Sequence, residues 1–116
     1  MFHHPLYPSR NEKGKPALRK AWLELFDTYH VDLVLQGHDH AYLRTYAMKA
    51  DKRVASPKEG TIYIVSNAGA KHYKQTDHAY IDKGMTKLST LQVLDISHRG
   101  EEPGVQGIRR DRQDCR

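Results

Sequence analysis

An amphipathic segment that runs almost directly into an apolar one constrains the fold of this chain most. Apolar side chains recur with helical spacing over residues 16–29: Leu18, Trp22, Leu25, Phe26 and Tyr29. Pro16 is typical of a first helical turn. Residues 31–35 are mostly aliphatic and are followed by Gly37, which predicts a short, mostly buried strand. A helix joined this closely to a strand predicts an α/β fold, with the helix packed on a sheet.

Two further segments are expected to extend that sheet. Residues 61–66 are rich in β-branched side chains, and residues 88–96 place Leu91 and Val93 on one face of a predicted strand. Residues 41–48 are interpreted as either another strand or an irregular arm, and residues 49–60 as a polar loop. With 116 residues, the chain has room for one small domain.

Composition excludes several classes of protein. The 19 basic and 14 acidic side chains are interspersed, which argues against a specific nucleic-acid-binding module. The apolar runs are too short for a membrane span, and the single cysteine, Cys115, excludes an internal disulfide. Residues 1–5 do not resemble a signal peptide, so the sequence assigns the chain to no compartment.

Histidine is the unusual feature of the composition, because four of the eight histidines lie in two tight groups. His38 and His40 follow the carboxyl end of the strand predicted at residues 31–35, which is where ligands collect in α/β sheets. In an extended segment, side chains two residues apart project to the same side and can serve one metal ion or two adjacent ones. The alternative is a polar turn with two surface histidines.

The second group is His3 and His4, followed by Pro5. Proline restricts the residue before it to an extended conformation, which fixes the direction of the preceding side chains. Alone, this group is best interpreted as a histidine pair without a partner. A metal site needs three or four protein ligands, so the two groups together would be required to build one.

The order of these motifs resembles a known family. The pattern His3-x-Pro5-x-Tyr7, then the amphipathic helix, then residues 31–42 ending in Gly-His-Asp-His-Ala-Tyr, then residues 60–66, is similar to the C-terminal half of the calcineurin-like metallophosphoesterases. The most similar subgroup is that of the purple-acid-phosphatase-like bacterial enzymes. The resemblance implies that residues 1–98 are the C-terminal part of a four-layer α/β/β/α fold, a partial β-sandwich with a flanking helix.

The resemblance also implies the chemistry. Members of this family hydrolyse phosphoesters with two metal ions, Fe, Zn or Mn, which activate a bound water. By this resemblance His3 and His38 ligate one metal and His40 the other. Asp39 occupies a variable position of the motif and is expected either to support a ligand or to face solvent.

Three further residues are candidates for contact with a phosphoester substrate. Tyr42 and Arg44 lie beside His38 and His40 in the sequence. His4 is not a ligand by the pattern. It either supports the site or faces phosphate, or it is solvated.

The family's earlier motifs, Asp-x-His, Gly-Asp and Gly-Asn-His, occur nowhere in the sequence. We therefore expect a fragment that is inactive alone, that holds at most one metal ion and that associates with the missing N-terminal half of a parent. A secreted or periplasmic parent is compatible with the resemblance. The alternatives are a non-catalytic remnant that binds a metal or a partner, and a basic nucleic-acid-binding module. Residues 99–116 lack apolar periodicity and are expected to be a disordered or aberrant tail.

Overall fold

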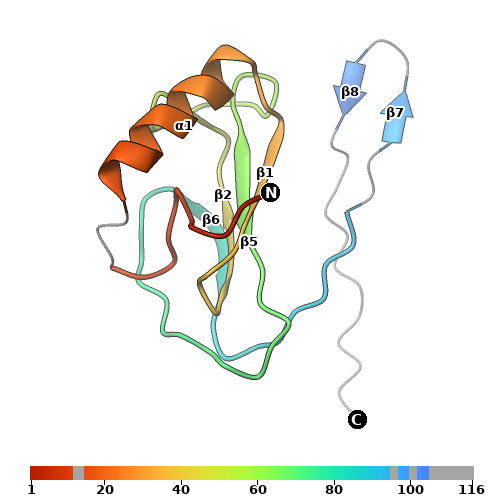
Figure 1. The fold of residues 1–116 in the computed structure, drawn as a ribbon. Helices are drawn as coiled ribbons and strands as arrows, with labels where there is room; N and C mark the ends of the chain where they lie inside the picture. The colour runs from red at the N-terminus through yellow and green to blue at the C-terminus, as the bar shows by residue number, and fades with distance from the viewer. Residues whose placement is uncertain (12–14, 95–96, 100–101, 105–116) are drawn as a thin grey trace.

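The fold is a mixed β-sheet with one helix on it, which confirms the predicted α/β class (Figure 1). The computed structural model describes residues 1–11, 15–94, 97–99 and 102–104. The four strands of the sheet lie in the order β1-β5-β2-β6. Their bounds are Leu33–Gln36 for β1, Tyr42–Thr45 for β2, Ile62–Val65 for β5 and Ile81–Met85 for β6.

Strand β5 lies inside the sheet and makes both kinds of pairing. It runs parallel to β1, with Leu33 opposite Ile62, and antiparallel to β2. Strand β2 also pairs antiparallel with β6. Residues 61–66 were predicted as a strand, and β5 confirms this. The arm at residues 41–48 contains β2 and then β3, Met48–Lys49.

Helix α1 spans Pro16–Thr28, one residue shorter at its end than the periodicity predicts. Pro16 occupies the first turn. His30, two residues after the last helical residue, has a left-handed backbone with a φ of 47°. The amide of Val31 donates to the carbonyl of Phe26 at 3.0 Å, which closes the helix and turns the chain into β1. Among the described residues, no helix has the length and apolar character needed to cross a membrane.

The face of α1 that packs on the sheet differs from the predicted apolar stripe. Leu23 is the buried residue of the helix, whereas Trp22 and Leu25 are exposed and Tyr29 is 76% exposed. Arg19, which lies outside the predicted stripe, is partly buried and donates to the carbonyl of Leu6 at 2.8 Å. Phe26 of the predicted stripe still packs against the core, so the buried face of α1 overlaps the predicted one only in part.

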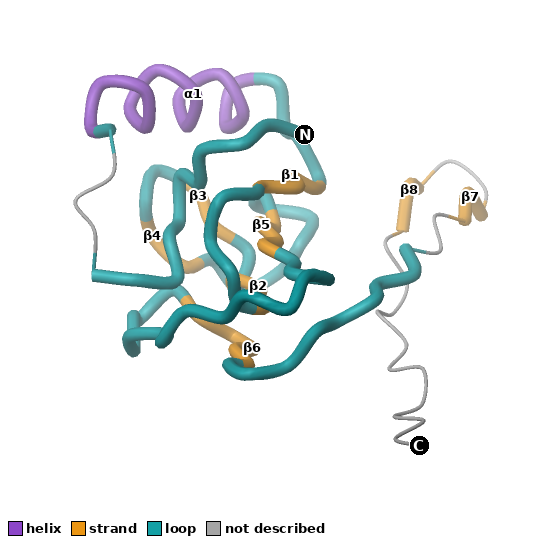
Figure 2. Tube along the Cα trace, turned by 60° about the horizontal axis from the view of Figure 1, so that its bottom comes forward, coloured by secondary structure: helices purple, strands orange, loops and turns teal. Residues whose placement is uncertain are grey.

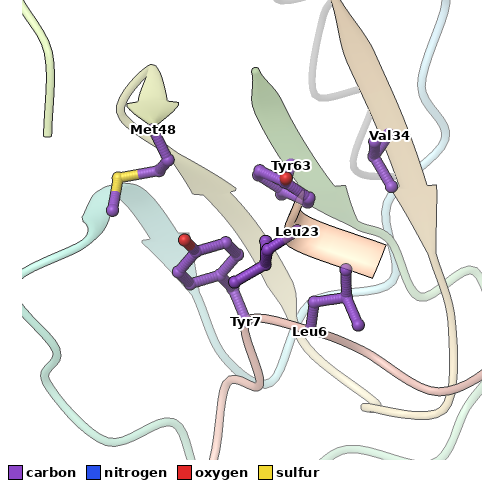
Figure 3. Close-up of a cluster of buried hydrophobic side chains, with 6 residues drawn as sticks. All are labelled: Leu6, Tyr7, Leu23, Val34, Met48 and Tyr63. Atoms are coloured by element: carbon purple, nitrogen blue, oxygen red, sulfur yellow. The ribbon is translucent and has the colours of Figure 1, made fainter. Parts of the chain in front are cut away.

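The core lies between α1, the sheet and the N-terminal segment (Figure 3). Tyr7 and Tyr63 are fully buried, and their ring centroids are 4.7 Å apart. The buried cluster has six members: Leu6, Tyr7, Leu23, Val34, Met48 and Tyr63. Segments far apart in the sequence thus share one core, and the N-terminal residues are part of it.

A hairpin in the predicted polar loop locks this arrangement. Strands β3 and β4 (Lys52–Arg53) pair across a turn at Ala50 and Asp51, whose φ angles are both positive. The carboxylate of Asp51 accepts the hydroxyl of Tyr7 at 3.0 Å and the guanidinium of Arg19 at 2.7 Å. Partial burial acts to raise the pKa of Asp51, but these hydrogen bonds outweigh it and leave that pKa below its ordinary value of 3.8.

The strand predicted at residues 88–96 is not formed over residues 88–94, and residues 95–96 lie outside the described residues. Leu91 is 93% exposed and Val93 is 66% exposed, so the described residues do not bury the apolar side chains of this segment. Strands β7 (Ser97–Arg99) and β8 (Glu102–Gly104) pair antiparallel and stand apart from the main sheet (Figure 2). Most of the predicted tail lies outside the described residues, so its prediction stays a prediction.

Candidate functional site

The N-terminal segment lies along the outer edge of β1 and brings His3 beside Gly37 and His38. Phe2 forms a parallel bridge with Gln36, donating to Leu35 and accepting from Gly37, both at 3.1 Å. The amide of Gly37 also donates to the carbonyl of His3 at 3.1 Å. A Cβ at Gly37 would lie 3.3 Å from that carbonyl oxygen, so glycine permits the close approach.

This pairing brings two of the predicted ligands into contact. His3 Nε2 lies 3.1 Å from His38 Nδ1, although the residues are 35 positions apart in the sequence. His38 has a left-handed backbone, at φ 69°, and this turns its ring toward the N-terminal segment. One of the two nitrogens carries the proton and donates it to the other.

His4 joins the same group. Its ring centroid lies 5.2 Å from that of His3 and 5.4 Å from that of His38. Lys15 Nζ is 3.5 Å from His4 Nε2, and the positive charge of Lys15 is the main cause of a lowered pKa at His4. His3 and His4 are exposed and His38 is half-buried, so solvent reaches this histidine cluster, defined as His3, His4 and His38.

His40 has other neighbours. Its Nδ1 lies 3.2 Å from the carbonyl oxygen of Lys71, and its ring lies 4.6 Å from that of Tyr73. Since a carbonyl can only accept, the Nδ1 of His40 carries the proton. This leaves Nε2 unprotonated in the neutral ring, with a lone pair available to a ligand. The extended geometry expected for residues 38–40 is not formed, because the chain bends there.

Asp39 is buried and is turned toward the N-terminal segment, so the solvated alternative for this residue is wrong. Its carboxylate accepts the backbone amide of Ser9 at 2.5 Å and the hydroxyl of Ser9 at 2.9 Å. Arg10 approaches the same carboxylate at 3.5 Å. Asp39 therefore anchors the segment that carries His3 and His4.

Two anchoring residues were not predicted. Gln36 is buried at the end of β1, and its Oε1 accepts the amides of Leu6 at 2.6 Å and Tyr7 at 3.3 Å. Asn67 follows β5, is also buried and donates to the carbonyl of Lys71 at 2.8 Å. A polar side chain at a buried position at the end of an apolar strand was the available signal for Gln36.

Tyr42 and Arg44, the two predicted substrate contacts, lie on β2. Tyr42 is buried, at 5% exposure. Arg44 donates through Nε to Asp82 on β6 at 3.0 Å, and through a terminal nitrogen to the same oxygen. The structure therefore brings His4 to the predicted ligands His3 and His38, whereas Arg44 is paired within the sheet.

Within the part of the chain that the structure describes, no group of three or more His, Cys, Asp or Glu side chains is arranged to hold a metal ion. The histidine cluster has one pair of nitrogens at close range, His3 and His38. The Nε2 of His4 is directed to the ammonium of Lys15.

Comparison with known proteins finds two relatives. The chain is 36% identical over 88 residues to the uncharacterized proteins MT2654 and Rv2577 of two Mycobacterium tuberculosis strains, CDC 1551 / Oshkosh and ATCC 25618 / H37Rv. Each match covers 72% of this chain but 16% of the relative, so the chain spans about a sixth of the length of these proteins. No protein-family model and no solved structure matches the chain.

Proposed function

We propose that this chain is part of a metal-dependent phosphoester hydrolase and that it supplies histidine ligands to its metal centre. The observation that carries the proposal is the 3.1 Å approach of His3 Nε2 to His38 Nδ1. Both residues follow parallel backbone segments, the Phe2 bridge and β1, at the same edge of the sheet. His38 lies just beyond the carboxyl end of β1, and α/β sheets bind ligands at the carboxyl ends of their strands.

The distance between the two nitrogens suits a shared ion. Two imidazole nitrogens on one tetrahedral metal are about 3.3 Å apart when the metal–nitrogen bonds are about 2.0–2.1 Å. His3 and His38 already lie within a few tenths of an ångström of that separation, so small ring rotations would direct both lone pairs to one point. Neutral imidazole suits Zn, Mn and Fe, the metals that the family resemblance implies.

His40 fits the role of a ligand to a second metal ion. A metal-bound histidine usually donates its other ring N–H to a carbonyl or carboxylate, which fixes the ring and its tautomer. In His40 the Nδ1 N–H is donated to the carbonyl oxygen of Lys71 at 3.2 Å. Asn67 donates to the same carbonyl and holds the loop that carries it.

When bound, such ions lower the pKa of a coordinated water and stabilise the charge that develops on a phosphoester. The contribution of this chain would be to orient the imidazoles, through Asp39 for His3 and His4 and through Lys71 for His40. Tyr42 and Arg44 remain the proposed substrate contacts. Because Arg44 is paired with Asp82, contact with a phosphate would require that pair to open.

The chain alone is expected to be inactive. A pair of dications needs an anion between them, and the carboxylate of Asp39 is buried against Ser9 rather than directed toward His38 or His40. A longer parent would supply the bridging carboxylate. A non-catalytic remnant that binds a metal would share the histidine cluster but would not bind phosphate.

Phosphate binding separates these two functions. Inorganic phosphate is titrated by calorimetry into the chain loaded with Zn²⁺ or Mn²⁺ and into the metal-free chain. We expect the loaded chain to bind phosphate and the metal-free chain to bind at least tenfold more weakly, because the ion supplies the positive charge. Hydrolysis of nitrophenyl phosphate by the chain alone is expected to stay at background.

A loaded chain that binds metal but shows no affinity for phosphate would contradict the hydrolase proposal and favour the non-catalytic alternative. Metal-dependent hydrolysis that His40→Ala abolishes would support the hydrolase and show that this chain assembles the centre by itself. Neither outcome depends on which histidine completes the first metal site.

A further inference from the structure

One side of α1 carries large apolar side chains that the described residues leave uncovered. Trp22 is 40% exposed, Leu25 is 47% exposed and Tyr29 is 76% exposed, and their spacing puts them on one side of the helix. These three residues are called the exposed stripe below. Helix α1 lies at the outside of the fold in both Figure 1 and Figure 2. A continuous apolar surface of this kind marks an interaction site, whereas a single exposed apolar residue does not.

Ring contacts hold the first residue of the exposed stripe in place. The ring centroid of Trp22 lies 5.8 Å from that of Phe2 on the N-terminal segment and 5.5 Å from that of Phe26. Phe2 also stacks on Phe26, at 6.1 Å. A side chain that is already ordered loses less conformational entropy when a partner packs on it.

The exposed stripe is directed away from the core of its own molecule. Successive residues of an α-helix are rotated by about 100° about the helix axis. Trp22 therefore projects about 100° away from Leu23, the buried residue of α1, and Leu25 projects about 160° away from it. A second helix can lie against this side of α1 without meeting the sheet beneath it.

The exposed stripe itself carries no charge. The charged residues of the same part of the helix, Lys20, Glu24 and Asp27, lie outside it. Thr28 lies beside the stripe, and its hydroxyl already donates to the carbonyl of Glu24 at 2.7 Å, so its burial would leave no donor unpaired. The chemistry of the stripe therefore matches an uncharged apolar surface rather than a charged partner.

We propose that two copies of this chain form a two-fold symmetric dimer through their exposed stripes, with the α1 helices antiparallel. Leu25 stands between Trp22 and Tyr29, so the stripe complements a reversed copy of itself. A two-fold axis beside Leu25 brings the two Leu25 side chains together. It also places Trp22 of each copy within about 1.5 Å of the height of Tyr29 in the other copy. On the other side of the stripe, the small residues Ala21 and Thr28 allow the helices to approach closely.

The available area suits a weak dimer. A buried aromatic side chain covers roughly 150–250 Å², so the exposed fractions of the three residues leave roughly 350 Å² of surface in each copy. The flanking residues Leu18, Ala21 and Thr28 raise the total for two copies to roughly 1,000 Å². Interfaces below about 1,200 Å² are typical of transient complexes, so we expect the dimer to dissociate on dilution.

Sedimentation equilibrium of the 116-residue chain tests this proposal. We expect the average mass to rise from 13.4 kDa towards twice that value between about 10 µM and about 1 mM protein. Leu25→Glu places a charge beside the two-fold axis and should weaken dimerisation at least tenfold. Lys20→Glu is the matched control, because it introduces the same side chain at an exposed position outside the stripe, and it should dimerise like the parent. Circular dichroism checks that both variants are folded.

A cysteine cross-link tests the predicted geometry. In a Cys115→Ser background, Leu25→Cys places one thiol of each copy beside the axis, and facing residues of paired helices approach the about 4.4–6.8 Å between Cα atoms that a disulfide requires. We expect oxidation to yield a covalent dimer from Leu25→Cys and none from Lys20→Cys. If Leu25→Glu does not fold, this cross-link decides the question.

Two results would overturn the proposal. One is a parent chain that stays monomeric over the whole concentration range, which would leave the exposed stripe to another occupant, such as the rest of a longer parent. The other is a folded Leu25→Glu variant that associates as strongly as the parent. The proposal goes beyond the proposed function, because the stripe contains none of the proposed metal ligands. Phosphate binding is measured separately, so failure of the dimer and failure of the hydrolase proposal are distinguishable.

Discussion

His38 and His40 are separated by one residue, yet their rings have different neighbours. His38 faces His3 and His4 on the N-terminal segment, where the rings contact one another. His40 faces the loop after β5, where the carbonyl of Lys71 fixes its Nδ1 proton. The first environment brings imidazoles together, and the second orients a single imidazole. The two histidines are therefore suited to different parts of a metal centre.

The residue between them produces this difference. Asp39 is buried and draws Ser9 toward the sheet edge, while the left-handed backbone of His38 turns its ring to the same side. Two-residue periodicity would place His38 and His40 together, but it holds only in an extended strand. A histidine-x-histidine pattern thus does not define a common direction unless the backbone is known.

Replacement of Asp39 should have the largest effect, because Asp39 holds the N-terminal segment that carries His3 and His4. We expect Asp39→Ala to lower the free energy of unfolding by about 2–4 kcal/mol, because the amide and hydroxyl of Ser9 and the charge of Arg10 lose a buried acceptor. Urea denaturation measures this change. Asp39→Asn is the control and should lose less, since its amide oxygen can still accept from Ser9. Equal stability of parent and Asp39→Ala would contradict the anchoring role.

Replacement of Asn67 should affect the loop that contacts His40 and leave the histidine cluster unchanged. Asn67 is buried and donates to the carbonyls of Lys71 and Gly69, so we expect Asn67→Ala to lower the free energy of unfolding by about 1–2 kcal/mol. The Zn²⁺ affinity of the histidine cluster should stay within about twofold of the parent. A loss of Zn²⁺ affinity comparable to that of His38→Ala would show that the two sides are coupled.

Acid should weaken the hydrogen bonds that Asp51 accepts from Tyr7 and Arg19, with a smaller effect on stability. The folded-state pKa of Asp51 is lowered, so its stabilisation is complete above the unfolded value of 3.8 and is lost as the pH falls through the lower folded value. The side chain is 49% exposed, so we expect only about 0.5–1 kcal/mol. Thermal unfolding between pH 5 and about pH 2 should show a smaller loss in Asp51→Asn than in the parent. Identical losses would exclude this anchor as a source of acid sensitivity.

Local sequence patterns determined the helix and the central strands. Pro16 and the apolar spacing predicted α1 to within one residue of its end, and the aliphatic runs predicted β1 and β5. These elements depend on contacts a few residues apart, which a sequence displays directly. The pairing of His3 with His38, by contrast, was implied by the family resemblance and not by local patterns.

Only the tertiary structure decided which side chains these elements bury and which histidines meet. Arg19 on α1 reaches Leu6 and Asp51, which are distant in the sequence, and Leu91 is exposed although its pattern predicts burial. Likewise, His4 enters the cluster through a bend that the pairing of Phe2 with β1 stabilises. Each outcome rests on contacts between residues distant in sequence, which local periodicity does not specify.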